Sequence, residues 1–411
     1  MRIAVVGGGA AGLVTAWLLE QEHEVTLFES ADRLGGHAHT VEIEVDGQRL
    51  AIDAGFQFFG PGRAYATFNR LLDHLGVARE IYPATMTLHR SAEGGSVALP
   101  PWRDGRPVGE SLTPAAIVDL VRFRRFLSGI PAFLARHDTS ITIDEYIRDR
   151  RMPASFVDRF LYPLLLALWC LELEEFRGFS AYNALYYLGE SLTDGYPPTQ
   201  SQIVGGMKTY IDALAASLSR ARVVLGARVE RVSRDEGGYV VEGERFDQVV
   251  IATNARLAHG MLEGVSAADR LREKLVRIEY FDTTIAVHGD RSLMPERTAA
   301  WSVVNARWDG IHSQLSIWTR GHGLPVFRSW VTFQERMPEP LYAVATYEHG
   351  KVTPAYFDAQ RRLGELHGHD GVWLAGLYMG DADSHESAVL SAVAIAERLA
   401  PRSERFRMLR P

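Results

Sequence analysis

The feature that most constrains the fold of this chain is a glycine-rich loop that directly follows an apolar run at the amino terminus. Residues 3–6 read Ile-Ala-Val-Val, and glycines follow at positions 7, 8, 9 and 12. The apolar run predicts a buried parallel strand, and the spacing G-x-G-x-x-G predicts a turn into a helix that binds a dinucleotide. In this interpretation Gly7 permits the tight turn, Gly9 lets the backbone approach a pyrophosphate, and Gly12 lets the helix pack closely on the strand.

The residues after this loop complete a dinucleotide-binding unit. A helix is predicted from Ala10 to about Glu20, and its first N–H groups, on Ala10 and Ala11, would face the phosphates. A second predicted strand, residues 24–28, ends at Glu29, whose carboxylate can accept hydrogen bonds from both hydroxyls of an adenosine ribose. Because this carboxylate would repel a 2′-phosphate, the sequence disfavours NADP.

A second glycine pair indicates which dinucleotide binds. Gly35 and Gly36 follow Glu29 closely, and residues 53–57 read Asp-Ala-Gly-Phe-Gln. NAD-dependent dehydrogenases need no second glycine loop here, whereas the ribityl chain and ring system of a flavin continue past the pyrophosphate and need close backbone. We therefore predict FAD, bound without a covalent link, with further contacts from Ser30, Arg33, Gly35, Gly36, His37, Gly55, Phe56 and Gln57.

The order of strand, G-x-G-x-x-G, acid and Arg33-Leu34-Gly35-Gly36 resembles the flavin amine oxidase superfamily, which includes phytoene desaturases and protoporphyrinogen oxidases. It is most similar to a bacterial branch described as predicted FAD/NAD-binding oxidoreductases. The resemblance continues at Gly205-Gly206-Met207, in the apolar run 246–253 and in residues 371–388. The predicted fold class is α/β, with a Rossmann-like, glutathione-reductase-type FAD domain and an interleaved α+β substrate domain.

The two domains are expected to alternate along the chain. We assign residues 1–58, 200–257 and 355–411 to the FAD domain, and residues 59–199 and 258–354 to the substrate domain. A hairpin is predicted from residues 40–45 and 49–52, and short strands at 223–225, 228–232 and 239–242. Helical periodicity in residues 65–75, 115–134 and 154–169, together with many aromatic residues, marks the first insertion. Some of these aromatic side chains are expected to line a cavity for substrate.

The resemblance also implies cofactor contacts far from the first loop. It implies that the backbone of Val229 contacts the adenine and that Ala252 lies near the ADP. It further implies a final helix, beginning at about Ser387, whose positive end points at the flavin pyrimidine. Ser384 is predicted to cap this helix. The remaining contacts expected in this segment are Gly380, Asp381, Ser387 and Ala388.

The chain departs from the family pattern at three positions. Ser387-Ala388 stand where the family has a glycine, and Leu377 stands where many members hold the ribityl chain with a carboxylate, for which Asp381 is a candidate substitute. Amine oxidases of this fold usually carry a lysine that holds water at flavin N5, and residues 280–288 contain no lysine. The missing lysine weighs against amine oxidation of the usual type and against fast oxygen reduction.

Few residues are candidates for catalysis. Tyr378 is a candidate to face the flavin ring, and His385 lies beside the predicted flavin-facing helix, while His37 and His39 flank the second glycine loop. A histidine chosen in this way is more often a structural hydrogen-bonding group, and hydride transfer to a flavin needs no strong base. No general base is therefore assigned.

Composition excludes several other functions. The net charge of −7 gives no basic field for nucleic acid or an anionic membrane. The single cysteine, Cys170, excludes an intrachain disulfide, and no metal-ligand spacing is present, so no metal is predicted. No apolar run is long enough to span a membrane, and the amino terminus does not fit an export signal, so a cytoplasmic, bacterial-type location is expected. A nucleophile elbow and a second dinucleotide fingerprint are also lacking.

The sequence thus predicts an FAD-dependent oxidoreductase that dehydrogenates or desaturates a small lipophilic or amine-type substrate. The alternative is a flavin-dependent isomerase that moves a double bond with no net redox change. A flavoprotein without enzymatic activity is a third reading. The substrate, the electron acceptor (oxygen, quinone or other) and the oligomeric state stay open.

Overall fold

Short apolar runs from five distant parts of the chain pair into one parallel sheet in the computed structural model, which describes residues 1–90, 95–103, 105–193, 198–318 and 323–410. The strand order is β11-β2-β1-β15-β21, so β1 has a parallel partner on each side. The chain order reverses at β1, and ligands bind outside the carboxyl ends of the strands at such a point. The strands are β1 (Arg2–Val6), β2 (Glu24–Phe28), β11 (Arg222–Val224), β15 (Gln248–Ile251) and β21 (Val372–Leu374).

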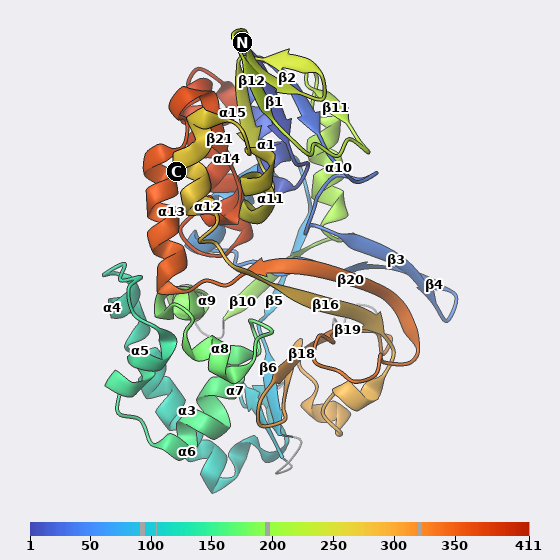
Figure 1. Cartoon of the computed structure of the whole chain (residues 1–411). Helices are drawn as coiled ribbons and strands as arrows, with labels where there is room; N and C mark the ends of the chain where they lie inside the picture. Colours follow the sequence, from blue (N-terminus) through green and yellow to red (C-terminus); the bar gives the residue numbers. More distant parts are fainter. Residues whose placement is uncertain (91–94, 104, 194–197, 319–322, 411) are drawn as a thin grey trace.

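Helices cover this sheet in the upper part of Figure 1. Helix α1 (Ala10–Leu19) is buried on every side, because it lies between the sheet and α14 (His385–Leu399). This position explains why its sequence is apolar all round rather than amphipathic. The helices α10 (Lys208–Ala216) and α15 (Glu404–Leu409) pack against α1 and α14 respectively.

An antiparallel meander follows β11, formed by β12 (Ser233–Asp235), β13 (Gly238–Val241) and β14 (Glu244–Phe246). The strands predicted at 223–225 and 239–242 correspond to β11 and β13. The strand predicted at 228–232 is wrong, because this segment has no strand partner. Val229 and Val232 are buried there, but the N–H of Val232 donates to the carbonyl of Met261, at the end of α11 (Ala255–Met261). Burial against a helix, rather than pairing in a sheet, produces the apolar pattern.

A second sheet forms the lower part of the molecule, in the order β20-β16-β19-β18-β17-β6-β7. All its pairs are antiparallel except β17 with β6, which are parallel. Its strands come from two distant stretches of chain: β6 (Met86–Arg90), β7 (Ser96–Leu99), β16 (Tyr280–His288), β17 (Val304–Trp308), β18 (Ser313–Trp318), β19 (Phe327–Trp330) and β20 (Leu341–Gly350).

Helices of the first insertion lie beside this sheet, at the lower left of Figure 1. The helix predicted for 115–134 is interrupted at Ser128 and Gly129, and the one predicted for 154–169 contains a π-helical turn and ends at Leu166. The helix predicted for 65–75 is α2 (Ala66–His74). The insertion helices are α3 (Pro114–Leu127), α4 (Ile130–Leu134), α5 (Ile143–Asp149), α6 (Ala154–Phe156), α7 (Tyr162–Leu166), α8 (Leu173–Arg177) and α9 (Ala181–Thr193).

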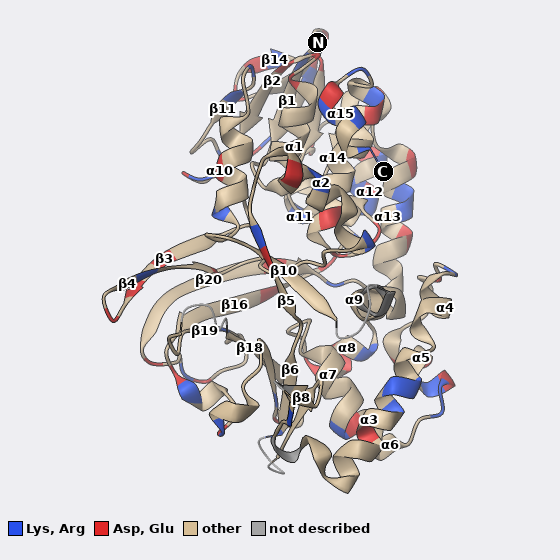
Figure 2. Cartoon of the chain, turned by 180° about the vertical axis from the view of Figure 1, so that it is seen from behind, with Lys and Arg blue, Asp and Glu red and all other residues tan. Residues whose placement is uncertain are grey.

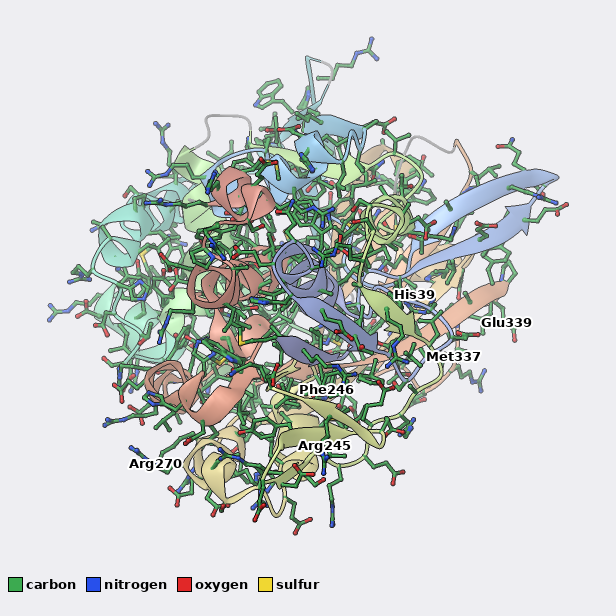
Figure 3. The ribbon with its side chains drawn as sticks, turned by 90° about the horizontal axis from the view of Figure 1, so that it is seen from above. His39, Arg245, Phe246, Arg270, Met337 and Glu339 are labelled. Atoms are coloured by element: carbon green, nitrogen blue, oxygen red, sulfur yellow. The ribbon has the colours of Figure 1, made fainter. Side chains whose placement is uncertain are left out.

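Two strand pairs connect these parts. The predicted hairpin is present as β3 (Thr40–Val45) and β4 (Gln48–Asp53), which projects from the molecule in Figure 3, with His39 at its base. Its apolar residues pack on β16 and β20. The other pair is β5 (Arg79–Pro83) with β10 (Thr199–Ile203). The remaining elements are β8 (Trp102–Arg103), β9 (Arg106–Pro107), α12 (Asp269–Leu275) and α13 (Pro354–Leu366).

The surface carries charges of both signs. Acidic and basic residues lie together on α3, α13 and α15 in Figure 2. Across the described ranges, none of the helices combines the length and the apolar character that crossing a membrane requires.

Candidate active site

The loop after β1 is shaped by steric exclusion of side chains. Gly7 has φ +107°, and a Cβ on this residue would lie 2.7 Å from the carbonyl oxygen of Ala252. A Cβ on Gly12 would collide with the carbonyl group of Gly7, so the helix can approach the strand only without a side chain there. Gly9 caps α1 and offers no side-chain acceptor to the first N–H groups of the helix. These groups suit a phosphate, because a helix amino terminus carries a partial positive charge.

The carboxylate of Glu29 is held over this loop. Its Oε2 accepts from the N–H of Gly8 at 2.6 Å, and its Oε1 accepts from the N–H of Ala31 at 2.8 Å and the hydroxyl of Ser30 at 3.2 Å. Arg33 lies on the next loop and donates to the carbonyl of Gly36 at 3.2 Å. An acid fixed in this way at the end of β2 has the position that ribose recognition requires.

The second glycine pair joins the first loop directly. The N–H of Gly35 donates to the carbonyl of Gly8 at 2.8 Å, and Gly9 and Gly35 form an isolated parallel bridge. His37 follows Gly36 in the chain, and its carbonyl accepts from the N–H of Phe56 at 2.9 Å. A Cβ on Gly55 would collide with the same carbonyl. Backbone therefore approaches backbone along this path, which is the environment that a long cofactor needs.

The path ends at the amino terminus of α14. The rings of Phe56 and His385 are stacked, with centroids 4.5 Å apart and planes 2° from parallel. The Nε2 of His385 shares a hydrogen bond of 2.7 Å with the hydroxyl of Tyr210, and burial lowers the pKa of His385 to about 3, so the ring is neutral. Helix α14 starts two residues before the predicted position, and Ser384 caps it as predicted, accepting from the N–H of Ser387 at 3.0 Å.

Glu386, next to this cap, ties α14 to another helix. Its carboxylate accepts from the N–H groups of Thr67 at 2.8 Å and Phe68 at 2.7 Å, at the start of α2. Helix α2 has no side-chain cap of its own, so this distant carboxylate supplies one. The position of the α14 amino terminus is thereby fixed to α2.

Other predicted contacts lie at different depths around this path. The Ala252 carbonyl packs against Gly7, and Val229 is buried near the end of β11. A Cβ on Gly380 would collide with Ser387. The side chains of Gln57 and Ala388 are buried. Burial and close packing at these positions do not show whether the residues contact the cofactor, so these contacts stay predictions.

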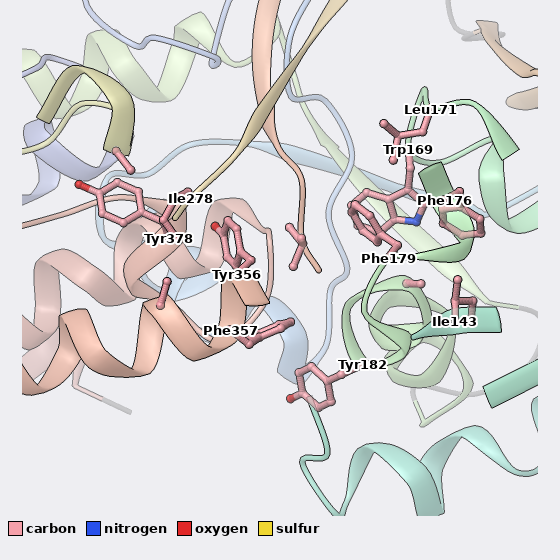
Figure 4. Close-up of a cluster of buried hydrophobic side chains, with 14 of the residues drawn as sticks. Ile143, Trp169, Leu171, Phe176, Phe179, Tyr182, Ile278, Tyr356, Phe357 and Tyr378 are labelled. Atoms are coloured by element: carbon pink, nitrogen blue, oxygen red, sulfur yellow. The ribbon is translucent and has the colours of Figure 1, made fainter. Parts of the chain in front are cut away.

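Asp381 and Tyr378 contact residues outside the two glycine loops. The carboxylate of Asp381 accepts from the hydroxyl of Tyr182 at 2.8 Å and lies 3.1 Å from the Nε2 of His137. Tyr378 is buried, and its hydroxyl has no hydrogen-bond partner in the part of the chain that the structure describes. In Figure 4 Tyr378, Tyr356, Phe357 and Tyr182 follow one another across an apolar cluster.

Asp383 is a candidate that sequence reasoning missed. Its backbone is fixed by α9, since its N–H donates to Asn183 at 2.9 Å and its carbonyl accepts from Tyr187 at 2.7 Å. Its carboxylate has no hydrogen bond or ion pair within the described residues, and burial raises its pKa to about 7. The hydroxyl groups that lie near enough to interact electrostatically belong to Tyr65, Tyr187, Tyr280 and Tyr356. Nothing in the local sequence separates this aspartate from a turn residue.

Two further residues that sequence reasoning missed, Tyr347 and His349, lie on β20 and pack on His37. The ring centroids of His37 and Tyr347 are 4.8 Å apart, and those of His37 and His349 are 5.6 Å apart. His39 shares a hydrogen bond of 2.8 Å with the hydroxyl of Tyr347. Burial lowers the pKa of His37 to about 4, although its side chain retains accessible surface. His37 is thus an exposed residue that neighbouring atoms surround closely, beside the second glycine loop.

Comparison with known proteins gives a consistent result. A family model described as flavin containing amine oxidoreductase matches residues 10–284. A Mycobacterium tuberculosis protein that carries the name flavin-containing monoamine oxidase AofH is 29% identical over 262 residues, which are 59% of this chain and 54% of that protein. Coproporphyrinogen III oxidase of Bacillus subtilis is 22% identical over 325 residues, 66% of this chain and 63% of that enzyme. The matched region spans between about half and two thirds of these relatives.

The fold is also similar to solved structures. A fatty acid isomerase from P. acnes that produces CLA has a TM-score of 0.71 and 15% identity, covering 97% of this chain and 98% of that one. At this identity the likeness concerns the fold alone. It agrees with the predicted α/β class, which is confirmed.

Proposed function

This chain belongs to the family of flavin-containing amine oxidoreductases, and on that premise we propose that it is a flavin-dependent oxidoreductase that binds FAD without a covalent link and removes a hydride from a small lipophilic or amine-type substrate. When bound, FAD supplies the ring that accepts the hydride; the protein supplies binding, orientation and proton transfer. The division into an FAD domain and a substrate domain, with the boundaries given above, is part of this proposal.

The observation that supports it best is the unbroken series of contacts from β1 to α14. Gly9 meets Gly35 in a bridge, the carbonyl of His37 meets Phe56, and Phe56 stacks on His385. The series begins at a helix amino terminus without a side-chain cap and ends at another helix amino terminus. An elongated molecule with a pyrophosphate at one end and an acceptor of negative charge at the other fits such a path.

We propose Asp383 as the group that accepts a proton. Removal of a hydride from a C–H bond next to nitrogen leaves a positive charge, which is neutralised when the N–H proton departs; in a desaturation the proton departs from the adjacent carbon. The carboxylate of Asp383 has no competing partner within the described residues, and burial raises its pKa to about 7, so that it is poised between its two protonation states near neutral pH. The four tyrosine hydroxyls near it do not titrate in this range, because burial raises the pKa of each.

His385 and Tyr378 have different roles in this proposal. His385 is neutral and stacked, and it orients Phe56 while bonded to Tyr210. Tyr378 lies in the apolar cluster with an unpartnered hydroxyl among the described residues. Direct participation of either residue in the reaction stays a prediction.

The alternative function is isomerisation of a double bond without net redox change. The P. acnes fatty acid isomerase has a similar fold along 97% of this chain, so a fold of this kind accommodates either chemistry. Turnover of a substrate in the absence of any external electron acceptor would support this alternative. A requirement for an acceptor would support the oxidoreductase.

An anaerobic screen of the purified protein tests the proposal. The protein should show the visible absorption band of FAD, and one metabolite class should bleach it while NADH does not. Rapid bleaching by NADH or NADPH alone would replace the proposal with a reductase. A colourless protein that does not take up added FAD would contradict it entirely.

A further inference from the structure

Strand β19 presents two different faces of the seven-stranded sheet. Ser329 shares hydrogen bonds with His288 at 2.7 Å and Ser316 at 2.6 Å, and the ring of Phe327 lies 5.2 Å from that of Trp301. Because side chains alternate along a strand, Arg328 and Trp330 lie on the opposite face. Trp330 packs there against the main apolar cluster, which includes residues of the insertion helices.

Arg328 is a cation that forms no ion pair among the described residues. Its cross-strand neighbours are Val287 and Ile317, and its Nε is buried without an acceptor. Within the described ranges its guanidinium makes no hydrogen bond or ion pair. Burial lowers the pKa of Arg328 to about 10, so the group is charged at neutral pH.

The acidic group that acts on Arg328 is Asp53, and one of its two carboxylate oxygens has hydrogen-bond partners elsewhere. Asp53 acts on it electrostatically, but the Oδ1 of Asp53 accepts from the hydroxyl of Thr40 at 2.6 Å and from the N–H of Met207 at 2.8 Å. No ion pair joins Asp53 to Arg328 among the described residues. A buried charge of this kind is unfavourable unless another group neutralises it.

Trp330 adds a second unsatisfied donor on the same face. Its Nε1 is buried and has no acceptor in the described part of the chain. It stands two residues from Arg328 on one strand, so both donors open onto the same side of the sheet. Unsatisfied buried donors that share a face call for an acceptor from outside the protein.

This pair of donors lies close to the proposed flavin path. Arg328 interacts electrostatically with Tyr347 and His349, whose rings contact His37 of the second glycine loop. The apolar cross-strand neighbours of Arg328 and the main apolar cluster form the surroundings of the two donors. A ligand held here would have an anionic end at Arg328 and an apolar body.

We propose that Arg328 and Trp330 form an anion subsite that binds the carboxylate of an otherwise apolar substrate. The guanidinium offers two parallel N–H groups to the carboxylate oxygens, and the indole N–H offers a third donor. This inference rests on the proposed function, because the subsite opens beside the same flavin path, and it specifies the substrate as a lipophilic carboxylic acid.

The test is a calorimetric titration of the FAD-loaded protein with octanoate and with octanamide, its neutral counterpart. The wild type should bind octanoate at least about tenfold more tightly than octanamide, since charge-assisted hydrogen bonds are stronger than neutral ones. Arg328→Gln should lose this preference, and Trp330→Phe should weaken octanoate binding about threefold or more. Arg307→Gln is the matched control, because Arg307 stands on the other face of the same sheet and should leave both affinities unchanged.

Several outcomes would overturn the subsite. Equal affinities for the two probes, no octanoate binding by the wild type, or unchanged binding in both Arg328→Gln and Trp330→Phe would each do so. A shift in the flavin reduction potential of ligand-free Arg328→Gln, with octanoate affinity retained, would assign the charge to the flavin instead. If Arg328→Gln does not fold, the titration is done with Trp330→Phe and Arg328→Lys instead. Arg328→Lys keeps the positive charge but cannot offer two parallel N–H groups to a carboxylate.

Failure of the proposed function would be seen separately. It would appear as missing flavin absorption, or as a flavin that no metabolite reduces. The titration requires no turnover, so a protein that carries FAD and binds the two probes equally would remove only the anion subsite.

Discussion

The candidate site lies between two walls, which we call the backbone wall, at the five-stranded sheet, and the side-chain wall, at the seven-stranded sheet. At the carboxyl edge of the five-stranded sheet the close contacts are made by backbone, as between Gly8 and Gly35. At the seven-stranded sheet they are made by side chains, as between His37 and Tyr347. A cofactor shared by many enzymes can be held by backbone at glycine positions, whereas a particular substrate needs particular side chains. Added atoms are therefore expected to cost most in the backbone wall, at Gly7 and Gly12, and lost groups are expected to cost most among the side chains.

The largest test of this comparison is Gly12→Val. A side chain here would collide with the Gly7 carbonyl, so α1 would have to move away from β1. We expect a loss of about 3 kcal/mol or more of stability, with little soluble protein, and no bound FAD in what remains. The ratio of visible to protein absorbance and the Tm measure both effects.

A glycine outside the backbone wall provides the control. Gly364 lies within α13, and a Cβ on it would meet nothing within 4 Å. Gly364→Ala should leave FAD content unchanged and stabilise by up to about 1 kcal/mol, because alanine favours a helix. Equal tolerance of both substitutions would show that the β1 loop is not sterically closed.

The largest test of a side chain in the candidate site is Asp383→Asn, in the loop before α14. Since the base acts when ionised and burial raises the pKa of Asp383 to about 7, the wild-type rate should rise with pH up to about 7 and then level off. Asn cannot accept the proton, so kcat should fall about 100-fold and the rise should disappear. The pH dependence of flavin reduction under anaerobic conditions measures both.

Stability separates this loss from misfolding. A carboxyl group with a raised pKa ionises more easily in the unfolded chain, so the wild type should lose stability as the pH rises from about 4 to about 7, and Asp383→Asn should be spared this loss. Asp212→Asn, on the exposed side of α10, should change neither profile. A pH profile that survives in Asp383→Asn would assign the proton to another group.

Much of the backbone wall could be predicted from the sequence because its information is local. The spacing of Gly7, Gly9 and Gly12 fixed a turn, and the observed β1, α1 and β2 lie within a residue or so of their predicted limits. The hairpin β3–β4 was predicted for the same reason, since alternating residues and a short turn define it. Which of these residues contact FAD stays a prediction.

The side-chain wall could not be predicted, because its residues meet only through long-range pairing. Tyr347 reaches His37 because β20 pairs with β16 in one register, and no local pattern specifies that register. Asp383 reads as a turn residue, and its burial depends on α9. The error at residues 228–232 has the same origin: Val229 and Val232 are buried, but the surface that covers them is not a strand.

A third test concerns the contact between α14 and α2, at Glu386. Glu386→Gln keeps one acceptor oxygen but places an NH2 group against a backbone N–H of α2. We expect a loss of about 1–3 kcal/mol in the free energy of unfolding, measured with urea, and weaker FAD binding as α14 loosens. Glu397→Gln, at an exposed position of the same helix, is the control and should change stability by less than about 0.5 kcal/mol. Equal effects of the two would mean that the α2 contact does not position α14.

The smallest expected effect is that of Tyr210→Phe, which removes only the hydroxyl bonded to His385. The Nε2 of His385 would lose its partner, and we expect a loss of about 1 kcal/mol in urea denaturation, with FAD content unchanged. The pH profile should also stay unchanged, because burial lowers the pKa of His385 to about 3 and the ring stays neutral at working pH with or without the hydroxyl. Tyr342→Phe, on the partly exposed strand β20, should change stability by less than about 0.5 kcal/mol. If Tyr210→Phe instead released FAD, the stacked pair of Phe56 and His385 would be part of the cofactor contact. The cofactor would then be held by side chains as well as by backbone at this end of the backbone wall.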